Sequence, residues 1–108
     1  MKTIKQYVLD NFETHEIKQI TEHGMVSGFG QLIYYTDTCA FHDEYETEIW
    51  NMLEEERLDC GYDTIMELIA NFNGSKHVGS MNQFKNLLCW YSVESVCQQI
   101  IDELEDTE

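Results

Sequence analysis

The sequence contains no proline among its 108 residues, and only 6 of them are lysine or arginine. Proline interrupts helix interiors because it lacks an amide hydrogen and clashes with the preceding turn, so its absence favours helices. No segment approaches the roughly 18 consecutive apolar residues of a membrane-spanning helix. The first residues carry charges where a signal peptide has an apolar run. We therefore expect a cytoplasmic protein with no membrane partner.

The 4 cysteines lack the spacing of a metal site or a redox motif. They are Cys39, Cys60, Cys89 and Cys97. Cys89 and Cys97 stand among apolar residues, which is typical of small side chains in a hydrophobic core. The spacing predicts reduced thiols and no metal held by cysteine.

What the chain does contain is enough apolar material for one globular domain over residues 1–108. Hydrophobic residues make up 43% of the sequence and aromatic residues 12%. The net charge is nevertheless −15, from 21 acidic residues. Such a chain avoids nucleic acid and anionic membranes and is attracted to basic surfaces, although solubility alone is an alternative explanation.

Apolar residues recur at helical spacing between glycine-rich turns, and capping residues open several of these segments. The pattern predicts an all-α fold, or nearly so, with about five helices around one core. A minor strand is an option near residues 31–35. The expected helices cover residues 3–12, 14–23, 36–60, 64–72 and a last segment that starts at Ser80.

The apolar residues of the last expected helix change sides midway. Phe84, Leu87, Leu88 and Tyr91 share one face, and Val93, Cys97, Ile100, Ile101 and Leu104 share roughly the opposite one. A helix with two apolar faces contacts two layers of structure. We predict that it is the central packing helix, with a bend at Ser92 or Ser95 as the alternative.

A row of acidic residues follows the expected helix over residues 36–60. Its members are Asp37, Glu44, Glu48, Glu55 and Asp59, spaced alternately seven and four residues apart. On one continuous helix they would occupy a sector of about 60° over about 33 Å. The row resembles a nucleic-acid backbone and would suit the basic groove of a DNA- or RNA-handling protein, while a solvated helix face is the alternative.

Trp50 lies off the apolar stripe of the same helix. It is a candidate binding anchor, because tryptophan is enriched in interface hot spots. Packing against a second neighbour in the core is the alternative.

Catalytic and metal motifs are not recognisable. His42 with Glu46, and His15 with Glu22 and His23, do not match the HExxH pattern, and neither group has a third ligand at a typical spacing. Cys39 precedes His42 by three residues, but the surrounding negative charge disfavours a thiolate. The glycines of SGFG and NGSKHVGS suit turns better than phosphate loops. We expect no enzyme, no cofactor and no metal.

Several short motifs resemble a family of small acidic proteins of tailed phages and their bacterial hosts. The matching residues are His23-Gly24, Ser27 to Phe29, Leu32 to Thr38, Glu48 to Trp50, Gly61-Tyr62, Glu67 to Ala70, Asn73-Gly74, Val78 to Ser80 and Gln83 to Tyr91. The resemblance brings no known activity or catalytic residues. It implies the context of host-defence inhibitors, including anti-restriction and anti-CRISPR proteins, in the host-cell cytoplasm.

Charge and resemblance together predict a non-enzymatic inhibitor that binds a basic, nucleic-acid-handling protein as a nucleic-acid mimic. Such a protein has no direct nucleic-acid partner. The alternative is a non-enzymatic adaptor or a homo-oligomer that associates through an apolar patch.

Overall fold

The computed structural model describes residues 3–23, 38–72, 74 and 79–106. These residues form six α-helices and no strand, which confirms the predicted all-α class. The helices are α1 (Ile4–Asn11), α2 (Thr14–His23), α4 (Thr38–Glu44), α5 (Glu46–Cys60), α6 (Ile65–Phe72) and α7 (Met81–Asp106). The predicted minor strand near residues 31–35 lies outside the described residues.

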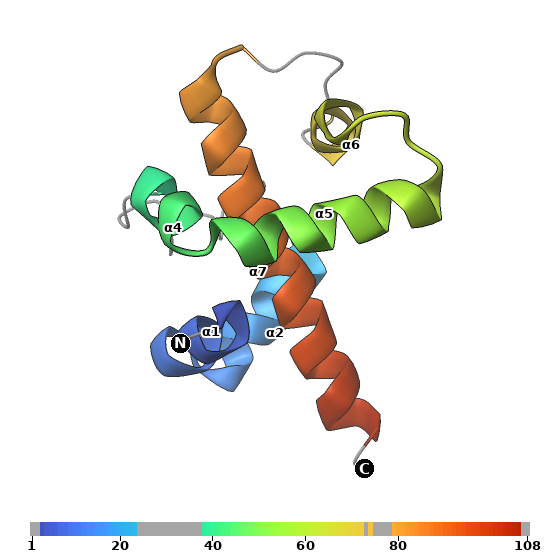
Figure 1. Ribbon diagram of the computed structural model, residues 1–108. Coiled ribbons are helices and arrows are strands. Elements are labelled where there is room, and N and C mark those ends of the chain that lie inside the picture. Colours follow the sequence, from blue (N-terminus) through green and yellow to red (C-terminus); the bar gives the residue numbers. More distant parts are fainter. Residues whose placement is uncertain (1–2, 24–37, 73, 75–78, 107–108) are drawn as a thin grey trace.

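The long helix α7 runs through the middle of the molecule and contacts each of the other five helices (Figure 1). It continues without interruption from Met81 to Asp106, so both of its apolar faces belong to one helix. Leu88, Val93 and Cys97 are fully buried within it. The prediction of a central packing helix is therefore confirmed, because α7 buries apolar side chains against neighbours on more than one side.

Local capping explains where several helices begin. At each of three starts, a hydroxyl oxygen accepts a hydrogen bond from the amide three residues later, as the capping-box pattern predicts. The bonds are 3.1 Å long from Gln6 to Thr3, from Glu67 to Thr64 and from Gln83 to Ser80.

The prediction of one continuous helix over residues 36–60 is wrong, because the helix breaks at Tyr45. Tyr45 has φ −106° and ψ 19°, and it separates α4 from α5. Its ring is buried, with its centroid 4.7 Å from that of Phe41 and 6.2 Å from that of Tyr7 on α1. The break accompanies this packing: Phe41 and Tyr45 contact α1, while α5 sets off across α7 (Figure 1).

The turn after α5 is held by glycine and arginine. Gly61 takes the left-handed conformation (φ 77°), which side chains other than hydrogen disfavour, and so ends the helix. The Tyr62 amide donates to the Arg57 carbonyl at 3.0 Å. The Arg57 guanidinium donates in turn to the carbonyls of Tyr62 and Asp63 at 3.2 and 3.3 Å. These bonds fix the direction in which α6 leaves α5.

Cys89 and Cys97 have the predicted core role, whereas Cys60 does not lie in the core. Cys89 and Cys97 are buried free thiols, and burial raises the pKa of Cys97 to about 12. Cys60 is an exposed free thiol at the end of α5. The side chain of Cys39 lies outside the described part of the chain. Within that part, no helix is both long enough and apolar enough to cross a membrane.

Candidate functional site

A groove runs along α7 between α5 and α6. It consists of two hollows of about 300 and 120 Å³ that adjoin at Tyr91 and Ser95. The larger hollow is lined by Phe72, Tyr91, Glu94, Ser95 and Gln98, and the smaller by Met52, Glu55, Glu56, Asp59, Tyr91, Ser95 and Gln99. We call the two hollows together the Tyr91 groove.

Helical spacing explains why these residues meet. Tyr91, Ser95 and Gln98 are four and three residues apart, so they form one stripe on α7. Glu55 and Asp59, four apart, form an acidic stripe on α5, which crosses α7 (Figure 1). In the smaller hollow the α5 carboxylates meet Tyr91, Ser95 and Gln99, whereas Gln98 lines only the larger hollow.

Aromatic rings form the wall of the groove on the α6 side. The ring of Phe72, the last residue of α6, packs against Tyr91 with the centroids 5.4 Å apart and the planes at 87°. This edge-to-face contact is the favoured arrangement for two aromatic rings. Phe72 lines the larger hollow only, while Tyr91 lines both hollows and so borders the α5 carboxylates in the smaller one.

The electrostatic potential in the groove is negative. The pKa of the Tyr91 phenol is raised to about 12, first by burial and then by the nearby Glu56 carboxylate, while a hydrogen bond with Ser95 lowers it in part. Glu94 adds to the increase. Negative charge next to the phenol disfavours the phenolate, and the same field attracts a cation.

Countercharges lie elsewhere among the described residues. Lys5 pairs with Glu103 at 2.8 Å and Lys85 with Asp43 at 3.3 Å. Arg57 pairs with Glu54 on the same helix. None of these ion pairs includes an α5 carboxylate that lines the groove, so the negative charge of that wall is not neutralised by a described lysine or arginine.

The predicted acidic row does not form one line. Asp37 lies outside the described residues, and the break at Tyr45 separates Glu44 on α4 from the rest of the row on α5. The Glu48 carboxylate accepts a hydrogen bond from the Ile4 amide at 3.0 Å. Glu48 therefore stabilises the start of α1, while Glu55 and Asp59 line the groove.

Trp50 is partly buried and packs against the core. Its ring centroid lies 6.1 Å from that of Phe84 on α7 and 6.4 Å from that of His42. These contacts favour the core-packing interpretation, and a role of Trp50 in binding stays a prediction.

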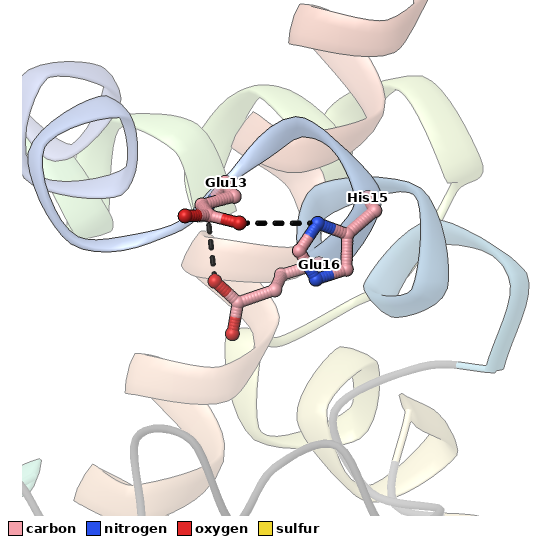
Figure 2. Close-up of side chains that lie close together, drawn as sticks. All are labelled: Glu13, His15 and Glu16. Carbon is pink, nitrogen blue, oxygen red and sulfur yellow. Dashed lines mark hydrogen bonds and ion pairs between the residues drawn. The ribbon is translucent and has the colours of Figure 1, made fainter.

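The histidines are arranged differently from the pairs singled out in the sequence. His15 groups with Glu13 and Glu16 at the start of α2, where their potential ligand atoms lie within 4.8 Å of one another (Figure 2). The Glu13 carboxylate is 3.3 Å from the His15 Nδ1 atom. Glu22 and His23 belong to the last turn of the same helix.

Helix capping accounts for the Glu13 group. The Glu16 carboxylate accepts from the Glu13 amide at 2.9 Å, while the Glu13 carbonyl accepts from the Ile17 amide at 3.0 Å. The Glu16 bond is one of the two bonds of a capping box, and sequence inspection missed it because glutamate occupies the position of the usual serine or threonine.

The break at Tyr45 separates His42 from Glu46, the other pair singled out in the sequence. His42 is buried on α4, with its Nδ1 atom 3.0 Å from the Asp43 carboxylate. Glu46 is exposed in the first turn of α5. The spacing of four residues therefore does not bring His42 and Glu46 onto one helix face.

Sequence inspection did not find the groove, because it assigned Tyr91 to an apolar face with Phe84 and Leu88. The signal that it overlooked is the polar stripe Tyr91, Ser95 and Gln98, which has the same helical spacing as the apolar stripes.

The fold and the groove define a small, strongly acidic, all-helical domain with an acidic and aromatic groove beside its central helix. Residues 1–106 match the family model of a domain of unknown function (DUF7222), and the chain belongs to that family. No curated protein matches the chain. No solved structure matches it either.

Proposed function

We propose that the protein is a non-enzymatic inhibitor that binds a basic, nucleic-acid-handling protein and occupies the surface where that protein holds nucleic acid. The observation that carries this proposal is the acidic wall of α5. Glu55, Glu56 and Asp59 stand on one side of the Tyr91 groove without a described lysine or arginine partner. Like charges at this spacing weaken a helix, so a basic partner would relieve a cost that the free protein bears.

Overall charge supports the same proposal. A net charge of −15 generates a field that speeds association with a basic surface and repels nucleic acid. The resemblance to phage proteins favours a host-defence protein of the anti-restriction or anti-CRISPR target class.

The alternative, an adaptor or homo-oligomer with an apolar interface, has less support. Among the residues that the structure describes, large exposed apolar side chains are distributed over four helices: Leu9, Leu58, Met66, Met81 and Leu104. Single exposed apolar residues are normal on soluble proteins, whereas an interface gathers them into one patch.

A pull-down from a bacterial lysate tests the proposal. The wild-type protein should retain a basic nucleic-acid-binding protein at low salt, lose it steeply as salt rises, and release it when duplex DNA is added. A triple variant, Glu44→Gln with Glu55→Gln and Asp59→Asn, should retain much less of it.

The matched control is the triple variant Glu22→Gln with Glu105→Gln and Asp106→Asn, which removes the same charge from the ends of α2 and α7. This control should retain most of the partner. Equal losses in both variants would show that only net charge matters. A partner that resists both salt and duplex DNA would contradict nucleic-acid mimicry and support the apolar adaptor.

A further inference from the structure

We propose that the Tyr91 groove receives an arginine side chain of the basic partner. This inference rests on the proposed function and adds to it a defined subsite with a defined occupant. The two hollows contain about 300 and 120 Å³ of space between helices that the rest of the fold holds in place. That space is large enough to receive a long side chain.

The lining of the groove matches the chemistry of a guanidinium group. Its planar faces are weakly hydrated and stack on aromatic rings, and its edge donates several hydrogen bonds in a fixed fork. Phe72 and Tyr91 supply the rings, which already contact each other edge to face. Glu55 and Asp59 supply acceptors in the smaller hollow, which Tyr91 also lines, while Phe72 supports the Tyr91 ring from the larger hollow.

Other cations fit the groove less well. A divalent metal ion prefers a cage of converging oxygen ligands, whereas among the described residues three potential ligand atoms gather closely only in the group of Glu13, His15 and Glu16. A lysine ammonium is compact and strongly hydrated, so it gains less from an aromatic wall than a guanidinium does. The mixed lining therefore selects arginine among the basic groups of a protein.

The acceptors of the groove differ in how much the fold already uses them. Glu56 accepts from the Cys60 thiol at 3.3 Å, and Gln98 donates to Asp102 at 3.0 Å. Glu55 and Asp59 are exposed on α5 and form no ion pair within the described part of the chain. These two carboxylates are therefore the ones that we assign to the arginine.

Two peptides of equal charge, tetra-arginine and tetra-lysine with blocked ends, test the inference. Each is titrated into the isotope-labelled full chain and followed by nuclear magnetic resonance. Tetra-arginine should shift the signals of Tyr91, Ser95 and Gln98 more than those of α1 and α2. It should also bind about two- to fivefold tighter than tetra-lysine, which is the worth of an exposed cation–π contact.

Two variants separate the walls of the groove. Tyr91→Leu keeps an apolar side chain and should abolish the preference for arginine while weak binding of both peptides remains. The double variant Glu55→Gln with Asp59→Asn should lower the affinity for both peptides. The control Glu105→Gln with Asp106→Asn should not change the affinity for one peptide more than for the other. Unchanged circular dichroism establishes that each variant is folded.

Several outcomes would overturn the inference. Equal affinity for the two peptides in the wild-type protein would remove the case for arginine. Shifts spread evenly over all acidic helices would remove the case for the groove. Tighter binding of spermine than of tetra-arginine at the same signals would assign the groove to a free polyamine.

The inference and the proposed function fail separately. If Tyr91→Leu retains as much partner from a lysate as the wild type, the inference about the groove is wrong and the proposed function stands. If the groove prefers arginine but no basic protein is retained at low salt, the proposed function is wrong.

Discussion

Two groups of aromatic residues lie on different parts of the molecule, and their surroundings differ. Phe12, Phe41 and Tyr45 are buried and meet Tyr7 where α1 and α4 pack together. Phe72 and Tyr91 make an equally close edge-to-face contact, but both are only partly buried and they border a groove. Similar ring contacts thus belong to the buried core between α1 and α4 and to the partly exposed lining of the groove. What separates them is the acidic stripe of α5, which faces Tyr91 where a further apolar helix face would close the groove.

The largest expected effect tests that difference directly. Phe41→Ala removes a ring that is 3% exposed and should lower the free energy of unfolding by about 3–5 kcal/mol. Phe72→Ala removes a partly exposed ring and should cost about 1–2 kcal/mol, because less apolar surface returns to water. Urea unfolding of both variants measures the two values. Equal costs would mean that the groove wall belongs to the core as fully as the closed cluster does.

The next effect separates two members of the predicted acidic row. Glu48→Ala should destabilise the protein by about 1–2 kcal/mol, because its carboxylate accepts from the Ile4 amide at the positive end of α1. Glu55→Ala should leave stability unchanged or slightly higher, because Glu55 is exposed beside like charges. Thermal unfolding at low salt compares them. A Glu48→Ala variant as stable as the wild type would mean that the bond to Ile4 does not stabilise α1.

The contrast between local helix caps and the distant contact of Glu48 shows which features the sequence could predict. The starts of α1, α6 and α7 follow from hydroxyl caps three residues from their partners, and such local patterns are visible in a sequence. The role of Glu48 depends on Ile4, which is 44 residues away. The break at Tyr45 likewise accompanies contacts with Tyr7, so the local stripe of apolar residues predicted a continuous helix instead.

The groove was beyond local prediction for the same reason. Helical periodicity placed Tyr91 on an apolar face, because it reports which residues share a stripe and not which neighbour covers that stripe. The directions of α5 and α6 determine which residues lie next to Tyr91. These directions depend on the turn at Gly61 and on the Arg57 hydrogen bonds. The acidic character of α5 was visible from the sequence, but not the position of its carboxylates beside Tyr91.

An alkaline titration probes the Tyr91 phenol in the groove. The Tyr91 phenol keeps its proton up to about pH 12 in the folded protein, whereas an unfolded tyrosine loses it near pH 10. Between these values the unfolded state binds fewer protons, so stability must fall as pH rises. Because Tyr91 is only partly buried, we discount its contribution to about 1 kcal/mol.

Tyr91→Phe isolates this contribution from Cys97, whose pKa is raised in the same direction by burial. The variant should lose less stability between pH 10 and 12 than the wild type does. Glu56→Gln should lower the pKa of Tyr91 only in part, because burial and not charge is its largest cause. Identical pH profiles for the wild type and Tyr91→Phe would show that the phenol titrates as it does in water.

The smallest change in stability belongs to the residues with the largest predicted role in binding. Glu55 and Asp59 repel each other at a spacing of four residues, and Asp59 also lies near the negative end of α5. Glu55→Gln with Asp59→Asn should therefore raise the free energy of unfolding by a few tenths of a kcal/mol, about the worth of one like-charge pair. Glu105→Gln with Asp106→Asn should give a gain of the same sign, since these residues end α7. Stability alone cannot distinguish the two pairs, but binding does: only the α5 variant should slow association with a basic partner and flatten its dependence on salt. A more stable α5 variant that binds as well as the wild type would mean that Glu55 and Asp59 serve solubility alone.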